Sequence, residues 1–177
     1  MPFPRPKKVY TEEELYEYAV SALGRRMRTV AELKRLLRQR VEIDTKIGQT
    51  LVELIIRKLK DQGYLNDAKY AASYSSYRAN DKFGRMRVMT DLKVKGVHGE
   101  VIEKAVGSVY EEIDEEKQAR EYLKRKRLQK PSDKKQAARI FRQLVRAGFR
   151  SKIIFTILKK WDVDEEMLTA LDEEVQE

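Results

Sequence analysis

The sequence predicts an all-α protein, an elongated and curved array of three tandem three-helix repeats followed by a short acidic C-terminal helix. Glycine (8) and proline (4) are scarce among the 177 residues, whereas charged residues reach 38%, a composition that favours helix over sheet. Three of the four prolines precede Lys7, so no proline breaks a helix between Lys7 and Lys130. Two stretches, 88–109 and 140–161, share one apolar pattern.

The shared pattern indicates internal repetition. Alignment of the two stretches pairs Leu92 with Leu144, Gly96 with Gly148, Val97 with Phe149 and Ile102 with Ile154. A third copy near the start carries Leu33, Leu36 and Leu37, with Arg40-Val41 at the glycine position. The period is about 52 to 56 residues, and a unit of that size buries too little surface to be stable alone, so we expect the units to stack.

The first repeat is predicted over 11–63, after a flexible N-terminus at 1–10. Thr11 with Glu14, and Thr29 with Glu32, have the spacing of capping boxes that begin helices. Gly63 is placed to end the last helix in a left-handed conformation. The apolar stripe of that helix is predicted at Leu51, Leu54, Ile55 and Leu59.

The second repeat is predicted over 64–112, with Gly96 ending its middle helix. Three tyrosines fall on one stripe of its first helix, and core packing is favoured over base stacking for them: Tyr70, Tyr74 and Tyr77. The last helix carries Ile102, Ala105, Val106 and Val109 on one face.

The third repeat is predicted over 113–161, with Gly148 ending its middle helix and Trp161 sealing its last apolar stripe after Ile154, Ile157 and Leu158. Residues 162–177 predict an acidic helix that packs through Met167, Leu168 and Leu171. A capping helix is favoured for this segment over electrostatic shielding of the basic third repeat.

Residues suited to catalysis or metal binding are few. Cysteine is absent, and the single histidine, His98, lies in a predicted exposed turn with no partner for a metal. Gly-rich phosphate-binding loops are missing, and the acids at 111–116 indicate a solvated linker or the start of a helix rather than an acid/base pair. We therefore expect no enzyme activity, metal or cofactor. Without a membrane span or signal peptide, the sequence predicts a cytoplasmic protein that does not engage membranes.

The net charge of +9 is unevenly distributed. Residues 117–160 hold sixteen Lys and Arg against two acids, whereas 161–177 hold eight acids and no base. Such a segment attracts polyanions or acidic protein surfaces, although a solubilising face is the alternative. Cations recur around the middle helix of each repeat and are the candidate binding residues: Arg25, Arg26, Arg28, Lys34, Arg35, Arg38, Arg85, Arg87, Lys93, Lys95, Lys124, Arg125, Lys126, Arg127, Lys134, Lys135, Arg139, Arg142, Arg146 and Arg150.

Several motifs, in order, resemble those of the RecX family, bacterial regulatory proteins that modulate the RecA recombinase. The segments are RMRTVAEL at 26–33, GYLNDAKYAASYSSYR at 63–78, FGRMRVMTDLKVKGV at 83–97 and RAGF at 146–149. The resemblance runs from about Tyr16 to Trp161. It departs from the family pattern at Arg40, Asn66, Asp91 and Ala147.

The resemblance implies a non-enzymatic monomer that acts in DNA repair, homologous recombination and the SOS response. Its expected partners are RecA, the RecA–ssDNA filament and, more weakly, single- and double-stranded DNA. It would lie in the filament groove and inhibit filament extension, ATP hydrolysis, strand exchange and coprotease activity. The alternatives are a general DNA-binding helical protein independent of RecA, and an adaptor for another acidic protein.

Overall fold

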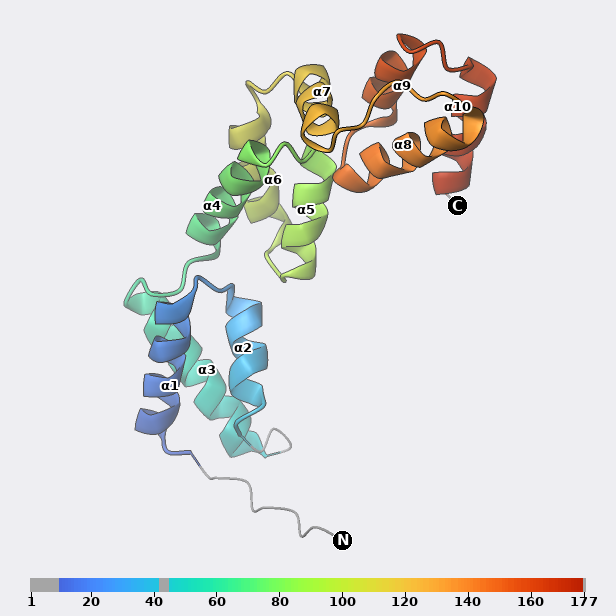
Figure 1. Ribbon diagram of the computed structural model, residues 1–177. Helices are drawn as coiled ribbons and strands as arrows, with labels where there is room; N and C mark the ends of the chain where they lie inside the picture. Colours follow the sequence, from blue (N-terminus) through green and yellow to red (C-terminus); the bar gives the residue numbers. More distant parts are fainter. Residues whose placement is uncertain (1–9, 42–44, 177) are drawn as a thin grey trace, which may run out of the picture. The chain divides into compact units, whose positions relative to one another are not determined.

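The computed structural model describes residues 10–41 and 45–176, and these residues form helices without any strand (Figure 1). The all-α prediction is confirmed. The predicted flexible N-terminus lies outside the described residues except for Tyr10. In chain order the helices are α1 (Glu12–Arg25), α2 (Val30–Arg38), α3 (Lys46–Asp61), α4 (Asp67–Asn80), α5 (Arg85–Val94), α6 (Gly99–Tyr110), α7 (Glu115–Arg125), α8 (Lys134–Ala147), α9 (Ser151–Lys159) and α10 (Glu165–Gln176).

The helix ends follow the predicted signals. Thr11 and Thr29 form complete capping boxes, in which the backbone N–H of Glu32 donates to the Thr29 hydroxyl at 3.1 Å and the N–H of Thr29 donates to the Glu32 carboxylate at 3.1 Å. The three predicted stop glycines are left-handed, with φ of 75° at Gly63, 77° at Gly96 and 89° at Gly148.

Backbone contacts divide the chain into two compact units. Unit 1 comprises Met1–Tyr70 and Val94–His98, and unit 2 comprises Ala71–Lys93 and Gly99–Glu177. The three repeat boundaries remain a prediction. His98 is exposed in the turn before α6, as predicted.

Unit 1 has its core between α1, α2 and α3. Leu15, Leu33, Leu37, Ile55 and Leu59 are fully buried in it. The predicted stripe of α3 was wrong at Leu54, which is 46% exposed. The buried stripe instead runs through Val52, Ile55, Ile56 and Leu59, because Leu54 falls on the opposite side of the helix from Val52.

The turn after α5 packs onto the start of α2 within unit 1. The buried Thr29 hydroxyl donates to the carbonyl of Lys95 at 2.7 Å. A Cβ atom on Gly96 would lie 2.4 Å from the Cβ of Ala31, so this approach requires glycine. Sequence-distant segments are thus joined through a helix cap.

Unit 2 repeats this contact with different residues. The turn after α8 packs onto the start of α5, where the N–H of Gly84 donates to the Ala147 carbonyl at 2.8 Å and the N–H of Met86 donates to the Gly148 carbonyl at 3.2 Å. A Cβ atom on Gly148 would lie 2.2 Å from the backbone nitrogen of Arg87. The aligned pair Gly96 and Gly148 therefore serves the same structural purpose twice.

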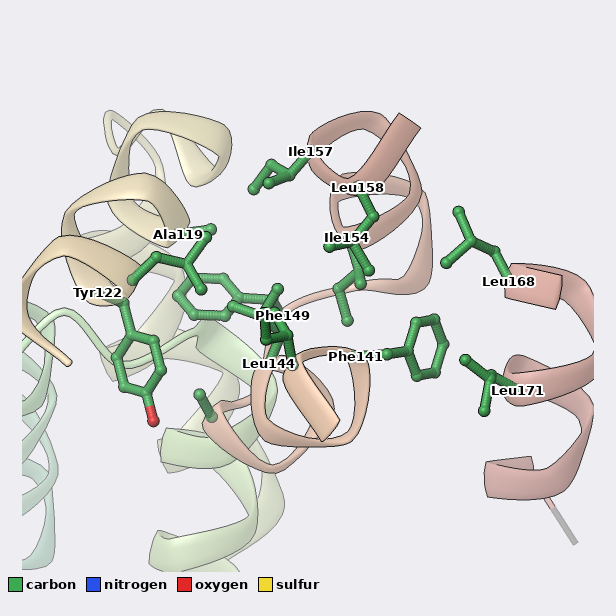
Figure 2. Packing of buried hydrophobic residues seen from close by; sticks show 13 residues of the cluster. Ala119, Tyr122, Phe141, Leu144, Phe149, Ile154, Ile157, Leu158, Leu168 and Leu171 are labelled. Atoms are coloured by element: carbon green, nitrogen blue, oxygen red, sulfur yellow. The ribbon is translucent and has the colours of Figure 1, made fainter. Parts of the chain in front are cut away.

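The main core of unit 2 lies between α7, α8, α9 and α10 (Figure 2). Phe141 points toward Leu168 and Leu171 of α10, while Phe149 and Leu144 lie closer to α7 (Figure 2). Leu168 is fully buried and Leu171 is 8% exposed, so the acidic helix completes this core. The predicted packing of the acidic helix is confirmed.

The tyrosine stripe on α4 was predicted incorrectly at one position. Tyr70 is buried and Tyr74 is half-buried, but Tyr77 is 61% exposed. In unit 2 the buried face of α4 passes through Ala71, Ser75 and Ala79, which repeat every four residues. Tyr77 lies outside that row.

Candidate anion-binding groove

A groove of about 490 Å³ on unit 2 gathers cations from α4, α5, α8 and the C-cap of α7. Its lining residues come from the end of α4 and the following turn, from α5, from α7 and from α8: Arg78, Phe83, Arg87, Tyr122, Lys126, Arg139, Gln143, Arg146 and Ala147. Four of these cations, Arg87, Lys126, Arg139 and Arg146, belong to the sequence-predicted set.

Helix α8 positions the cations along one wall. Arg139, Gln143 and Arg146 recur at spacings of four and three, and therefore share a helix face. The opposite face of α8, which includes Ile140 and Leu144, is buried in the core. Asp133 begins the helix by accepting the N–H of Gln136 at 2.7 Å.

The apolar lining of the groove is built from aromatic rings. Phe83 and Tyr122 meet edge to face with ring centroids 5.8 Å apart, and Tyr122 meets Phe149 at the same separation. The guanidinium of Arg78 lies 3.7 Å from the centre of the Phe83 ring. Rigid rings therefore support the charged groups.

Asp91 holds two of the arginines. Its carboxylate accepts from Arg78 Nη2 at 3.0 Å and from the Tyr74 hydroxyl at 2.9 Å, and it forms an ion pair with Arg87, whose Nε lies 2.9 Å away. The side chains of Arg78 and Asp91 are each only 16% exposed. Removal of Asp91 would leave the largely buried guanidinium of Arg78 without a carboxylate partner. An uncompensated buried charge lowers the free energy of unfolding.

Three cations of the groove have no such acid. Lys126, Arg139 and Arg146 are exposed, and no carboxylate among the described residues lies within 4 Å of their charged groups. The Lys126 ammonium lies 5.9 Å from the centre of the Tyr122 ring. The groove therefore carries a net positive charge that its own acid does not cancel.

The turn at 81–84 is fixed by two side-chain donors, one from the half-buried Tyr110 and one from the buried Gln118. The hydroxyl of Tyr110 donates to the Phe83 carbonyl at 2.8 Å, and the side-chain amide of Gln118 donates to the same oxygen at 3.1 Å. Burial raises the pKa of Tyr110 to about 12, so its hydroxyl remains a donor even at pH values well above neutral. These residues hold Phe83 at the groove.

Other predicted binding cations have internal partners. The clearest ion pairs and hydrogen bonds are Lys34 with Glu53, Lys95 with Glu32, Arg85 with Glu103, Arg125 with Asp81, Arg142 with Glu174, Arg150 with Glu115, and Arg28 with the Ala22 carbonyl. Lys95 is only 24% exposed and connects a turn to α2, so its contacts are structural.

The remaining predicted cations are exposed but lie outside the groove. In unit 1 they are Arg25, Arg26, Arg35 and Arg38; in unit 2 they are Lys93, Lys124, Arg127, Lys134 and Lys135. The sequence did not predict Arg78 as a groove residue, because its place there depends on tertiary contacts with Asp91 and Phe83. The one sequence feature that pointed to Arg78 is its position four residues after Tyr74, which places the two side chains side by side on a helix.

The described part of the chain offers neither a metal site nor a membrane span. No group of three or more His, Asp or Glu side chains there could hold a metal ion. No helix among those residues is long and apolar enough to cross a membrane.

Comparison with known proteins identifies the family. Residues 66–106, which include α4 and α5, match the model of the RecX second three-helix domain. The chain is 34% identical to regulatory protein RecX of Myxococcus xanthus, covering 88% of this chain and 87% of the relative. It is 32% identical to regulatory protein RecX of Deinococcus radiodurans, covering 89% and 74%.

This chain belongs to the RecX family. Two solved structures agree with that assignment. A crystal structure of RecX from Lactobacillus salivarius aligns with a TM-score of 0.62 at 25% identity, over 85% of this chain and 96% of that one. A second crystal structure of regulatory protein RecX gives 0.63 at 25% identity, over 84% and 71%. The RecX chains share its helical fold.

Proposed function

We propose that this RecX-family chain is a non-enzymatic, cytoplasmic regulator of RecA that binds the RecA–DNA filament. It acts as a monomer and inhibits filament extension, ATP hydrolysis, strand exchange and coprotease activity. The observation that carries the proposal is the groove, where Lys126, Arg139 and Arg146 lack acidic partners among the described residues. Cations that lack internal partners are suited to phosphates and to acidic side chains of a filament.

Binding through this groove requires no catalytic step. The aromatic rings and the hydrogen bonds of Asp91 already hold part of the groove lining in place. Less conformational entropy is therefore lost when a partner binds. Each exposed cation contributes a modest contact, and several together give affinity that depends strongly on salt. A regulator of this kind would act by occupying its site on the filament, which blocks the addition of RecA subunits or locks neighbouring subunits together.

The first test is the single-stranded-DNA-dependent ATPase rate of RecA, titrated with this protein well below one per RecA monomer. Suppression at such ratios is the expected result, because one bound molecule at a growing end affects many subunits. Suppression only when the protein saturates the DNA would contradict filament regulation. That outcome would favour a general DNA-binding protein, which the same exposed cations support.

A paired variant tests the groove itself. Arg139→Gln with Arg146→Gln removes two cations that lack acidic partners, and should weaken filament binding about 10-fold or more at moderate salt. Arg142→Gln is the control, because it removes a like charge from the same helix but outside the groove, where Glu174 accepts its hydrogen bonds at 2.8 and 3.0 Å. Equal losses in both variants would exclude the groove as the contact surface.

A further inference from the structure

A second depression of about 490 Å³ lies on another side of α7. Three cations line it, Arg120, Lys124 and Arg127, together with the apolar side chains of Leu128 and Trp161. None of these residues lines the groove described above. Trp161 is half-buried and packs against the core of unit 2, so its ring is supported from behind while part of it remains accessible.

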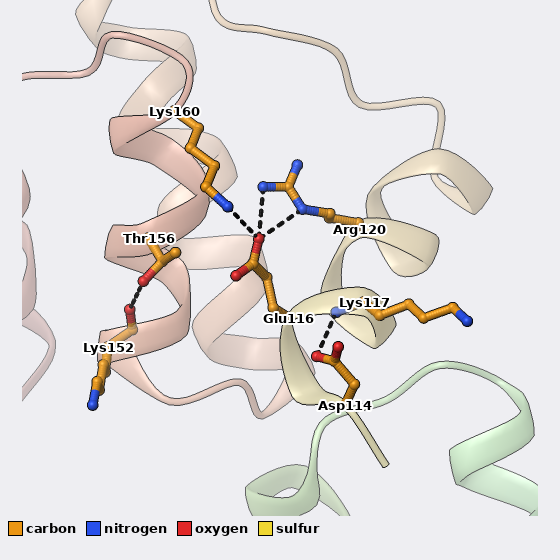
Figure 3. A network of polar contacts seen from close by, with 7 residues as sticks. All are labelled: Asp114, Glu116, Lys117, Arg120, Lys152, Thr156 and Lys160. Atoms are coloured by element: carbon orange, nitrogen blue, oxygen red, sulfur yellow. Dashed lines mark hydrogen bonds and ion pairs between the residues drawn. The ribbon is translucent and has the colours of Figure 1, made fainter.

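The charge beside this pocket is only partly balanced. Glu116 lies between two cations, accepting from Arg120 at 2.8 and 3.0 Å and from Lys160 at 2.8 Å through a single oxygen (Figure 3). Lys124 and Arg127 are exposed, and in the described part of the chain no carboxylate lies within 4 Å of either charged group. The pocket therefore retains at least two available positive charges.

Arg127 has an unusual backbone for a charged residue. Its φ is 55°, in the left-handed region where glycine is favoured. This conformation ends α7, because the N–H of Arg127 donates to the Lys124 carbonyl at 3.0 Å and the N–H of Leu128 donates to the Leu123 carbonyl at 2.9 Å. Glycine would suit such a helix-ending position, so the backbone does not require an arginine there.

We propose that this pocket binds one unpaired nucleobase of a single-stranded nucleic acid. The base packs against Trp161 and Leu128, while flanking phosphates are neutralised by Lys124 and Arg127. A tryptophan ring beside cations is the combination that binds single strands, since every base has a stacking face and every nucleotide a phosphate. Gln129, also in the lining, offers an amide for the edge of a base.

Base binding in this pocket does not require RecA, so its absence would leave the proposed regulation of RecA intact. An acidic peptide with an apolar anchor is the main competitor for such a pocket. The indole favours the nucleobase, because a flat ring provides stacking that an aliphatic anchor does not use.

Trp161 is the only tryptophan of the chain, so its fluorescence reports on this pocket directly. Oligothymidylate should quench it in the full-length protein without RecA. An abasic oligonucleotide of equal length has the same phosphates but no bases, and should bind about 5- to 100-fold more weakly. Equal binding and quenching by both would overturn the base-stacking proposal, as would quenching by polyglutamate but not by oligothymidylate.

Arg127→Gly provides the second measurement. Glycine suits the left-handed backbone, so the unfolding midpoint should stay the same or rise. Affinity for oligothymidylate should fall, and the slope of log affinity against log salt should become shallower by about 0.7, the value for one phosphate contact on a single strand. Lys104→Gln is the control, because Lys104 is exposed on α6 and lines neither this pocket nor the groove. An unchanged slope in Arg127→Gly would overturn the assigned phosphate contact.

Discussion

Glu32 receives hydrogen bonds from two parts of unit 1. One carboxylate oxygen accepts the N–H of Thr29 at 3.1 Å and completes the capping box, while the other accepts from Lys95 at 3.2 Å. Burial acts to raise the pKa of Glu32, but the Thr29 N–H and the Lys95 ammonium outweigh it and hold the pKa below its ordinary 4.5. Burial would lower the pKa of Lys95, yet hydrogen bonds with Tyr70 and Glu32 raise it.

Glu32→Gln tests this pair through pH. Glutamine can still accept from the Thr29 N–H, but it has no charge for Lys95, so the free energy of unfolding should fall by about 0.5–1 kcal/mol at pH 7. Since the folded pKa of Glu32 is depressed, its contribution is fully present above pH 4.5 and is lost as pH falls through the folded value. In urea unfolding measured from pH 7 to pH 3, the difference in the free energy of unfolding between variant and parent should therefore become smaller as the pH falls. A constant difference would contradict a role for the charge.

At the scale of elements, the helix-ending turns are what join distant segments. The turn after α5 contacts the start of α2, and the turn after α8 contacts the start of α5. In each case a left-handed glycine both ends a helix and permits close approach. Backbone conformation and tertiary packing are thus set by the same residue.

Gly148→Ala should lower the free energy of unfolding by about 2–4 kcal/mol, because the new Cβ would meet the Arg87 backbone at 2.2 Å and φ is 89°. Gly107→Ala is the control, since Gly107 lies within α6 with no atom within 4 Å of the new Cβ. That substitution should raise stability by about 0.5–1 kcal/mol. Chemical denaturation of both variants measures the contrast, and similar effects would refute the close-approach argument.

Helix α10 is held by apolar burial more than by its charges. Leu168 is fully buried, whereas the ion pairs Arg142 with Glu174 and Lys159 with Glu165 join side chains 39–67% exposed, and such pairs contribute little. This geometry supports a capping helix.

Leu168→Ala should cost about 2–4 kcal/mol of unfolding free energy, because it leaves a cavity beside Phe141. Val175→Ala, at a side chain 39% exposed on the same helix, should stay within about 0.5 kcal/mol of the parent. Denaturation curves followed by circular dichroism give both values. A negligible loss at Leu168 would mean that α10 does not complete the core.

At the scale of the whole molecule, the net charge of +9 acts on partners more than on stability. Many cations are screened by exposed ion pairs, whose individual contributions to folding are small. Cations that have no acid nearby attract a polyanion by releasing its counterions. Added salt should therefore weaken DNA binding strongly while changing the free energy of unfolding little.

Raising potassium chloride from low to moderate concentration should change the free energy of unfolding by less than about 1 kcal/mol. Duplex DNA affinity should fall with a slope of about −2.7 in log affinity against log salt, if Lys126, Arg139 and Arg146 each neutralise one phosphate. Fluorescence anisotropy and urea unfolding in matched buffers measure the two effects. A slope near zero would mean that these cations do not contact DNA.

The sequence by itself determined the helical class, the capping boxes, the stop glycines, the repeated pattern and the resemblance to RecX. These features depend on residues a few positions apart, because helix hydrogen bonds and caps are local. Only the tertiary structure decided which cations are available. Lys160 is balanced by Glu116, 44 residues away, whereas Arg146 meets no acid among the described residues. Spacing could not distinguish these two side chains, because a charge is neutralised by whatever the fold brings beside it.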